Sequence, residues 1–239
     1  MASMSPHEQP VVIVTGASRG IGAGIVDGYR ARGWAVVANA RAMKPSEDPG
    51  VLTVDADVSD PATADRIVGE ALERFGRVDT LVNDAGVFIG KPFTDYTAED
   101  YETAIGVNLT GFFTLTQRVI AEMLQRGSGH VVNITTTLVD YASSQRPSVL
   151  TSLTKGGIAA ATRSLAIEYA SRGIRVNAVS PGVVQTADSP DGYDALAALQ
   201  PLGRVGQIRD IVDGILFLES SPFITGEILH VDGGQIAGH

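Results

Sequence analysis

A glycine-rich octapeptide near the start of the chain has the composition of a phosphate-binding loop. It reads Thr15-Gly16-Ala17-Ser18-Arg19-Gly20-Ile21-Gly22 and comes at the end of the apolar run VVIVTG. Glycines between a strand and a helix let the backbone approach a pyrophosphate closely, and the following helix offers free N–H groups and the positive end of its dipole. The spacing Gly-x-x-x-Gly-x-Gly departs from the general dinucleotide fingerprint, so this loop alone is weak support for a nucleotide site.

Apolar runs alternate with stretches of helical period along the chain, beginning at this loop. Strands are predicted over 11–16, 34–40, 51–58, 80–86, 130–137, 175–182 and 227–234. Helices are predicted near 20–32, 61–75, 108–125, 152–171 and 209–218. Such an alternation requires right-handed crossovers, and hence a parallel sheet covered on both faces. We therefore predict one doubly wound α/β domain of about seven strands over residues 10–239, preceded by a polar tail over 1–9.

Composition narrows the class of protein. With a net charge of -9 and no run of Lys or Arg, the chain is not expected to bind nucleic acid. It has no cysteine, which excludes disulfides and thiolate nucleophiles, and no metal site is expected. No apolar run approaches the roughly 20 residues that a membrane span needs, and the first ten residues lack a signal-peptide pattern. We expect a cytoplasmic protein.

Several motifs occur in the order typical of one enzyme family. Besides the glycine loop, these are Asn83-Asp84-Ala85-Gly86, Asn108, Lys155, the segment Pro181-Gly182 with Thr186, and ITGEILHVDGG near the C-terminus. Together they resemble the short-chain dehydrogenase/reductase superfamily, and in particular its 3-oxoacyl-carrier-protein reductases, over roughly residues 10–235. The resemblance implies a Rossmann-like fold, an NADP-dependent oxidoreductase activity and a small-molecule substrate.

The resemblance also assigns cofactor contacts to individual positions. Ala40 occupies the place where NAD-dependent members carry an acid for the ribose 2′-hydroxyl, and Arg41 follows it, while Arg19 faces the same ribose from the glycine loop. Two guanidinium groups without a carboxylate favour a 2′-phosphate, so NADPH/NADP+ is the expected cofactor. The remaining implied contacts are Gly16, Ser18, Gly20, Ile21, Gly22, Asp57, Val58, Asn83, Ala85, Gly86, Lys155, Pro181, Gly182, Val184 and Thr186.

The implied catalytic residues are incomplete. Family members that reduce carbonyls use a serine, a tyrosine that donates a proton, and a lysine four residues after the tyrosine. Here Lys155 is preceded by Thr151 at the tyrosine position, and the serine position aligns with Thr136, with Thr135 and Thr137 as near alternatives. An aliphatic hydroxyl is a far weaker acid than a phenol, so Thr151 is a poor proton donor. Asn108 corresponds to the asparagine of the proton relay.

Two residues between the threonines and Lys155 are candidate substitutes. Tyr141 carries the nearest phenol in the sequence, although no lysine stands four residues after it, and a rim tyrosine is the simpler interpretation. Asp140 could stabilise a substrate cation, although an exposed loop carboxylate is again the simpler interpretation.

Three functions remain open from the sequence. The first is hydride transfer to an imine, an iminium or a hemiaminal in equilibrium with one, because reduction of an iminium needs no proton. The second is ordinary carbonyl reduction with a substitute donor, either Tyr141 or a water held by Asn108 and Lys155. The third is a non-catalytic NADPH-binding scaffold. The family resemblance further implies a homo-oligomer, most simply a tetramer or a dimer.

Overall fold

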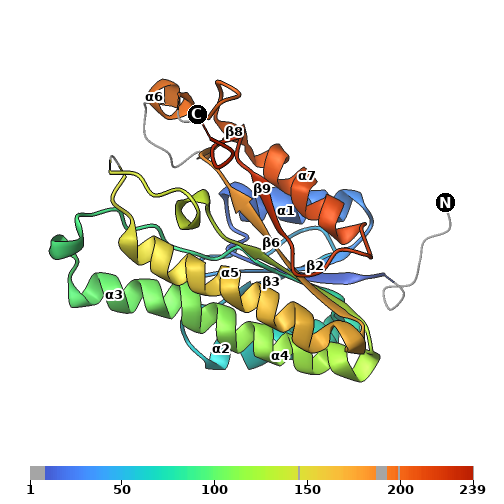
Figure 1. The fold of residues 1–239 in the computed structure, drawn as a ribbon. Coiled ribbons are helices and arrows are strands. Elements are labelled where there is room, and N and C mark those ends of the chain that lie inside the picture. Colours follow the sequence, from blue (N-terminus) through green and yellow to red (C-terminus); the bar gives the residue numbers. More distant parts are fainter. Residues whose placement is uncertain (1–8, 145, 187–192, 199, 239) are drawn as a thin grey trace.

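A single parallel sheet forms the centre of the molecule (Figure 1). The structure is a computed structural model, and it describes residues 9–144, 146–186, 193–198 and 200–238. The order of the seven strands is β3-β2-β1-β4-β5-β6-β9, so the chain winds outward from β1 in one direction and then from β4 in the other. The strands are β1 Val11–Thr15, β2 Ala35–Ala40, β3 Val51–Asp55, β4 Thr80–Asn83, β5 Gly129–Ile134, β6 Ile174–Pro181 and β9 Ile228–Val231. The predicted α/β doubly wound fold is confirmed.

Helices cover both faces of the sheet. Those of the main fold are α1 Gly20–Ala31, α2 Ala62–Phe75, α3 Ala98–Ala104, α4 Gly111–Arg126, α5 Val149–Tyr169 and α7 Ile208–Glu219. One core lies between the sheet and α2, α4 and α5, and the other lies between the sheet and α1 and α7. Figure 1 shows these two layers on opposite sides of the strands. Because both faces are covered, the β1 residues Val11–Thr15 are all buried, which explains their continuous apolar run.

The helical region before β5 starts earlier than the sequence pattern predicts. Thr97 and Asp100 form a capping box that begins α3, about ten residues before Asn108. The chain then passes through a π-helical turn, Ile105–Thr110, before α4. Such turns are rare in proteins, and those that do occur are frequently found at functional sites. The predicted helix 108–125 is therefore only the second part of a longer helical segment, and Asn108 lies in its irregular turn.

The strands end in polar loops, and a small second sheet lies beside the carboxyl end of β6. It pairs β7 Val184–Gln185 with β8 Gly206–Gln207. A short helix, α6 Tyr193–Ala197, lies between them in the sequence. Several of the predicted strands are too long: β3 ends at Asp55 and β4 at Asn83, because the residues after them turn outward and line a pocket. No helix of the described part of the chain is long and apolar enough to cross a membrane.

A largely buried carboxylate, Glu219, joins several elements at the amino-terminal ends of the central strands β4 and β5. Glu219, at the end of α7, accepts hydrogen bonds on Oε2 from the hydroxyls of Tyr29 (2.8 Å) and Thr80 (3.0 Å). His130 Nδ1 lies 3.1 Å from the same oxygen. Asn177 donates from Nδ2 to His130 Nε2, so the proton of this neutral imidazole is on Nδ1 and is donated to Glu219. Burial lowers the pKa of His130, which agrees with a neutral ring. Two strands and two helices are joined directly by this one group, and Asn177 extends the network to β6 through His130.

Removal of the Glu219 carboxylate is expected to destabilise the fold. Glu219→Ala leaves three buried donors without their acceptor, and we expect the free energy of unfolding to fall by about 3 kcal/mol. Glu219→Gln retains an acceptor oxygen and is expected to cost about 1 kcal/mol. Urea denaturation at pH 7 measures both. Equal stability of wild type and Glu219→Ala would contradict the role of this carboxylate.

The same experiment has a defined pH dependence. Burial acts to raise the pKa of Glu219, but the hydrogen bonds from His130, Tyr29 and Thr80 outweigh it and leave the pKa below its usual value. A carboxyl whose pKa is lower in the folded state stabilises the fold fully above its unfolded pKa, and this contribution is lost as pH falls through the folded value. The stability difference between wild type and Glu219→Gln should therefore shrink below about pH 4.

Candidate active site

The glycine loop turns from β1 into α1 with backbone conformations that only glycine adopts easily. Gly16 has φ 69° and Gly20 has φ 58°. Gly22 lies under the loop, where an added Cβ would collide with the Gly16 carbonyl oxygen and would come within 2.8 Å of Asp84 Oδ2. Arg19 stands at the N-cap position without capping α1 through its side chain. The N–H groups of the first turn are thus not capped from that position, as an anion-binding helix N-terminus requires.

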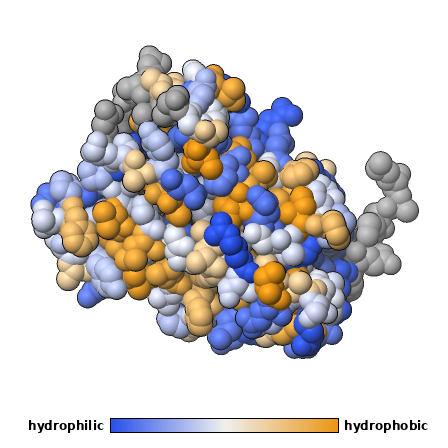
Figure 2. All heavy atoms as spheres, viewed as in Figure 1, coloured by the Kyte–Doolittle hydropathy of each residue, from blue (hydrophilic) through white to orange (hydrophobic). Residues whose placement is uncertain are grey.

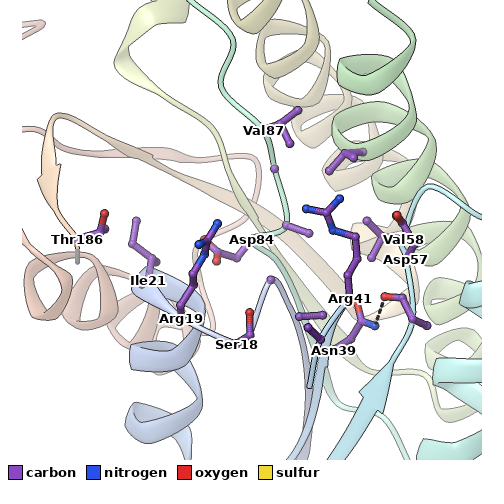
Figure 3. A pocket seen from close by; sticks show the side chains of 18 residues that line it. Ser18, Arg19, Ile21, Asn39, Arg41, Asp57, Val58, Asp84, Val87 and Thr186 are labelled. Carbon is purple, nitrogen blue, oxygen red and sulfur yellow. Dashed lines mark hydrogen bonds between the residues drawn. The ribbon is translucent and has the colours of Figure 1, made fainter. Parts of the chain in front are cut away.

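A cavity of about 500 Å³ opens beside this loop, at the carboxyl ends of β1, β2, β3 and β4. Figure 3 shows it lined from several separate segments of the chain. The structure brings twelve of the predicted cofactor residues to its wall: Gly16, Ser18, Arg19, Gly20, Ile21, Ala40, Arg41, Asp57, Val58, Ala85, Gly86 and Thr186. The position agrees with the rule that ligands of open α/β sheets bind where the winding direction reverses.

Two arginines approach this cavity from different elements. Arg19 comes from the glycine loop and Arg41 from the end of β2, and Figure 3 shows both side chains among those lining the cavity. Ala40 provides no carboxylate between them. Asp57, after β3, has its side chain turned to the backbone and hydroxyl of Ser59, whose hydrogen bonds lower the pKa of the Asp57 carboxyl. It is therefore ionised at neutral pH and held in a fixed orientation.

Asn39 is a cavity residue that the sequence motifs did not indicate. It is fully buried, and its Nδ2 donates to the carbonyls of Val54 and Ala56, which ties β2 to β3. Its Oδ1 is buried without a hydrogen-bond partner among the described residues. A buried acceptor in a ligand cavity calls for a donor from the ligand, such as a ribose hydroxyl or the exocyclic amine of adenine. A polar residue at the end of an otherwise apolar strand was the available signal.

The Asn83-Asp84-Ala85-Gly86 segment lies behind the glycine loop. The backbone N–H groups of Asp84 and Ala85 donate to Thr15 Oγ1. Asn83 is directed into the protein, where Nδ2 donates to Thr116 Oγ1 and to Asn133 Oδ1, both at 2.9 Å. The structure thus places Asn83 as a residue that joins β4, β5 and α4, outside the cavity wall, although its neighbours Ala85 and Gly86 line the cavity.

Lys155 and Asn108 meet in a narrow hollow that continues inward from the cavity. Lys155 is buried and donates from Nζ to the carbonyl of Ile134 (2.7 Å). Asn108 uses its whole amide: Oδ1 accepts from Val87 N (2.8 Å), and Nδ2 donates to Val87 O and to Thr154 Oγ1. Asn108 therefore holds the segment after β4 against α5. A side chain at Gly86 would lie 3.1 Å from Lys155 Nζ, so this glycine leaves the lysine accessible.

Asp84, which is partly buried, and Lys155, which is buried, are neighbouring titratable groups with perturbed pKa values. Burial raises the pKa of Asp84 to about 7, although Lys155 and a hydrogen bond from the Gly22 N–H oppose the rise. Burial lowers the pKa of Lys155 to about 8, and the charge of Asp84 opposes that shift. Both groups therefore titrate near neutral pH. Perturbed pairs of this kind are common at functional sites.

Of the three threonines after β5, Thr136 is the one available to a ligand. Thr135 is buried and donates to the carbonyl of Val179, and Thr137 is buried and donates to Gln235 Oε1. Thr136 is partly exposed, and its Oγ1 accepts from Leu138 N at 3.3 Å at the start of a 3₁₀ turn, Thr137–Val139. In the described part of the chain this hydroxyl donates no hydrogen bond, so its proton is available to a ligand, as alignment with the family serine requires.

The position of the expected tyrosine holds a small buried residue. Thr151 lies in the first turn of α5 and is 5% exposed, so it presents little surface to a ligand. Tyr141 is partly exposed, and its backbone N–H donates to the Thr137 carbonyl. Asp140 pairs with His230 on β9, with 3.2 Å between Oδ2 and Nε2. The structure therefore directs Asp140 toward β9, where His230 borders a different hollow.

The segment after β6 closes the far side of the glycine loop. Pro181 ends β6, and Gly182 packs so closely on Asp232 that a Cβ there would lie 2.8 Å from the Asp232 Cα. Val184 leads to Thr186, whose methyl group would lie 3.7 Å from a Cβ at Gly20. Tyr193, which sequence analysis did not single out, hydrogen bonds through its hydroxyl to both the N–H and the carbonyl of Thr186. The described residues contain no group of three or more side chains suited to a metal ion.

The geometry of the cavity fits a dinucleotide. It combines glycines that leave no room for side chains, a helix N-terminus, an arginine on each of two elements and a buried orphan acceptor at Asn39. A diphosphate matches the loop and helix N-terminus, and an adenosine moiety supplies donors for Asn39. The residues present therefore fit the nicotinamide cofactor that the family resemblance implies.

Comparison with known proteins agrees with the fold and the cavity. The family model described as Enoyl-(Acyl carrier protein) reductase matches residues 16–235. A 3-oxoacyl-[acyl-carrier-protein] reductase of Synechocystis sp. is 35% identical over 95% of this chain and 96% of its own. The structure of ElxO with NADP bound has a TM-score of 0.90 at 27% identity, covering 96% of this chain and 100% of that one. A blue fluorescent protein from a metagenomic library, in complex with NADPH, has a TM-score of 0.85 at 33% identity, with coverages of 95% and 97%. The chain belongs to the short-chain dehydrogenase/reductase superfamily of oxidoreductases.

Proposed function

We propose that this protein is an NADPH-dependent oxidoreductase that reduces a small organic substrate. Bound NADPH would supply the hydride from its nicotinamide ring. The glycine loop and the N-terminus of α1 would hold the diphosphate, Arg19 and Arg41 the 2′-phosphate, and Asp57 and Val58 the adenine. Lys155 would hold the nicotinamide ribose, and the segment from Pro181 to Thr186 the nicotinamide amide. The two arginines at the cavity, together with the absence of an acid at Ala40, support NADPH over NADH.

The substrate bond that we propose is C=N, in an imine, an iminium or a hemiaminal in equilibrium with one. The observation that carries this proposal is the buried Thr151 at the place of the family's proton donor. Hydride added to a neutral carbonyl creates an alkoxide that must be protonated, whereas hydride added to an iminium cancels a positive charge and needs no proton. A site that lacks the acidic phenol loses little with the second class of substrate and about a hundredfold to ten-thousandfold with the first.

Carbonyl reduction is the second candidate, and the buried Lys155 supports it. An ammonium group whose burial lowers its pKa to about 8 is a better acid than an ordinary lysine and lies beside the cavity. Tyr141 is the other candidate proton donor for carbonyl reduction. The reductase of Synechocystis named above belongs to this class of reaction, which makes a 3-oxoacyl thioester or another ketone a reasonable substrate to test.

A substrate panel distinguishes the two classes. Purified protein is mixed with NADPH and either ketones, including a 3-oxoacyl thioester, or cyclic imines of matched size, and NADPH consumption is followed. We expect the imines to be reduced faster than every ketone of similar size. Ketone turnover that exceeds imine turnover, together with a loss of about a hundredfold or more in Tyr141→Phe, would show that Tyr141 supplies the proton. NADPH binding without turnover of either class would identify a non-catalytic scaffold.

We also propose that the chain forms a homo-oligomer, most simply a tetramer. Figure 2 shows hydrophobic residues gathered on the surface over the start of α5. Among large apolar side chains, Phe113 on α4, Leu153 and Ile167 on α5, and Phe217 on α7 are more than half exposed. Such surfaces on long helices suit two-fold contacts between copies. Light scattering at micromolar concentration is expected to give a multiple of 25.0 kDa, and a particle of 25.0 kDa would refute the proposal.

A further inference from the structure

A carboxyl group lies in the part of the cavity that is otherwise suited to an anion. Asp84 lines the cavity, and Figure 3 shows its side chain near the glycine loop that carries Ser18 and Arg19. Its Oδ2 would lie 2.8 Å from a Cβ on Gly22 and 3.2 Å from one on Gly16. The Gly22 N–H, in the first turn of α1, donates to this carboxyl. Asp84 therefore places a carboxyl beside the helix N-terminus where a diphosphate is expected to bind.

We propose that Asp84 couples cofactor binding to the uptake of one proton: the dinucleotide binds tightly when the Asp84 carboxyl is neutral and weakly when it is ionised. This inference rests on the proposed binding of NADPH in this cavity. The physical reason is that an ionised carboxyl and a diphosphate at one helix N-terminus repel each other, and that partial burial of the carboxyl strengthens this repulsion. The neutral acid removes the repulsion and can also donate its own proton to an acceptor.

Before the cofactor binds, the Asp84 carboxyl is partly protonated and partly ionised at neutral pH. Burial brings the pKa of Asp84 to about 7, against the opposing effects of Lys155 and the Gly22 N–H. An anion that enters beside a carboxyl raises its pKa further, so at pH 8 binding must draw a proton from solvent. The balance is simple: ionised Asp84, one proton and the cofactor give neutral Asp84 with the cofactor bound.

The charged groups around Asp84 come from four elements. Lys155 approaches from α5, and burial lowers its pKa. Arg19 lies on the glycine loop, Arg41 at the end of β2 and Asp57 after β3. Of these, Lys155 is the group that acts on the pKa of Asp84, and it lowers it. The two arginines are expected to contact the cofactor's phosphates, which leaves Lys155 as the cation that stabilises ionised Asp84 and so opposes the effect of the diphosphate on its pKa.

Infrared difference spectroscopy tests the proton uptake directly. NADP+ is added to the protein at pH 8, and the carbonyl band of a protonated carboxyl is followed, with ¹³C-labelled aspartate to assign it. We expect this band to appear in the wild type and to be absent in Asp84→Asn. Titration of Lys155 cannot produce it, because a lysine has no carboxyl. Asp57→Asn removes another carboxyl of the same cavity and should retain the band.

Affinity for NADPH, measured by the change in its fluorescence, gives the second readout. With a pKa near 7, only about a tenth of Asp84 is protonated at pH 8, so Asp84→Asn should bind NADPH about tenfold more tightly than the wild type there and about equally at pH 6. Asp57→Asn should shift the affinity by a similar factor at both pH values. Binding to the wild type without a protonated-carboxyl band, or an Asp84→Asn variant that binds no more tightly at pH 8, would overturn the proposal. Absence of NADPH binding at every pH would instead refute the proposed function.

Discussion

Replacing Lys155 by methionine is expected to reduce turnover of the preferred substrate by about a hundredfold, the loss that follows when a group that positions the reactants is removed. Lys155 is buried in the hollow with Asn108, and its ammonium group lies beside Gly86, where we propose that it holds the nicotinamide ribose. Methionine has nearly the same length and fills the space, but it has no charge and no donor. Steady-state NADPH consumption at saturating cofactor measures the loss.

Thr151→Ala is the matched control, because Thr151 lies one helical turn before Lys155 on α5. If Thr151 gives no proton, this variant should retain turnover within about twofold of the wild type. A large loss in Thr151→Ala would contradict the proposal that the substrate needs no donor at this position. The pH profile is a further check: burial lowers the pKa of Lys155 to about 8, so its charge is present below that pH and lost above it. Turnover that depends on the charged lysine should therefore decline as pH rises through about 8.

Charge reversal at Arg41 is expected to weaken NADPH binding by about a hundredfold or more while NADH binding changes little. Arg41 lines the cavity at the end of β2, next to Ala40. The substitution Arg41→Glu removes a charge-assisted hydrogen bond, worth roughly 1.5–3 kcal/mol, and adds repulsion of the 2′-phosphate. NADH has a hydroxyl at that position, which a carboxylate accepts as a partner. Dissociation constants for both cofactors at moderate salt measure the change.

Arg41→Ala separates the two contributions. It removes the hydrogen bond without adding a negative charge, so it should weaken NADPH binding by about tenfold to a hundredfold and NADH binding hardly at all. For the wild type we expect NADPH to bind at least about tenfold more tightly than NADH. Equal dissociation constants for the two cofactors in the wild type would refute the assignment of the 2′-phosphate to Arg41 and Arg19.

The departures from the family pattern are concentrated on the proton-handling side of the site. The residue types that a cofactor site needs are retained in the glycine loop, at Lys155 and Asn108, and in the segment after β6. Thr151 replaces the phenolic donor, and Asp84 adds a carboxyl that titrates near pH 7. A chain that keeps the residues of its cofactor site and changes its acid groups is consistent with a reductase whose substrate does not need a proton from a phenol.

The fold could be predicted from the sequence because its signals are local. The apolar run Val11–Val14 marks a strand buried on both faces, and Gly16 and Gly20 mark the turn into α1, since their φ values suit glycine alone. Helix boundaries were less accurate near Asn108. There the capping box at Thr97 begins the helix early, and a π-helical turn interrupts it, which a regular 3.6-residue pattern does not reveal.

The cofactor residues could be named from the sequence, but only the tertiary structure decided what each side chain does. Asn83 lies in a family motif, yet its amide bonds to Thr116 and Asn133 inside the protein, while Asn39, in no motif, places an orphan acceptor in the cavity wall. Asp140 was a candidate for a substrate cation, and the structure pairs it with His230, ninety residues away. Motifs record residue type and order, whereas hydrogen-bond partners depend on distant segments that meet only in the folded chain.

The titratable groups of the site also show which properties come from the sequence and which from the tertiary structure. The sequence by itself determined that a threonine stands four residues before Lys155 and that an aspartate follows Asn83. Only the tertiary structure placed the partly buried Asp84 and the buried Lys155 near each other by the glycine loop, which brings both pKa values toward neutrality. The physical reason is that a pKa depends on desolvation and on the charges nearby, and both are properties of three-dimensional packing.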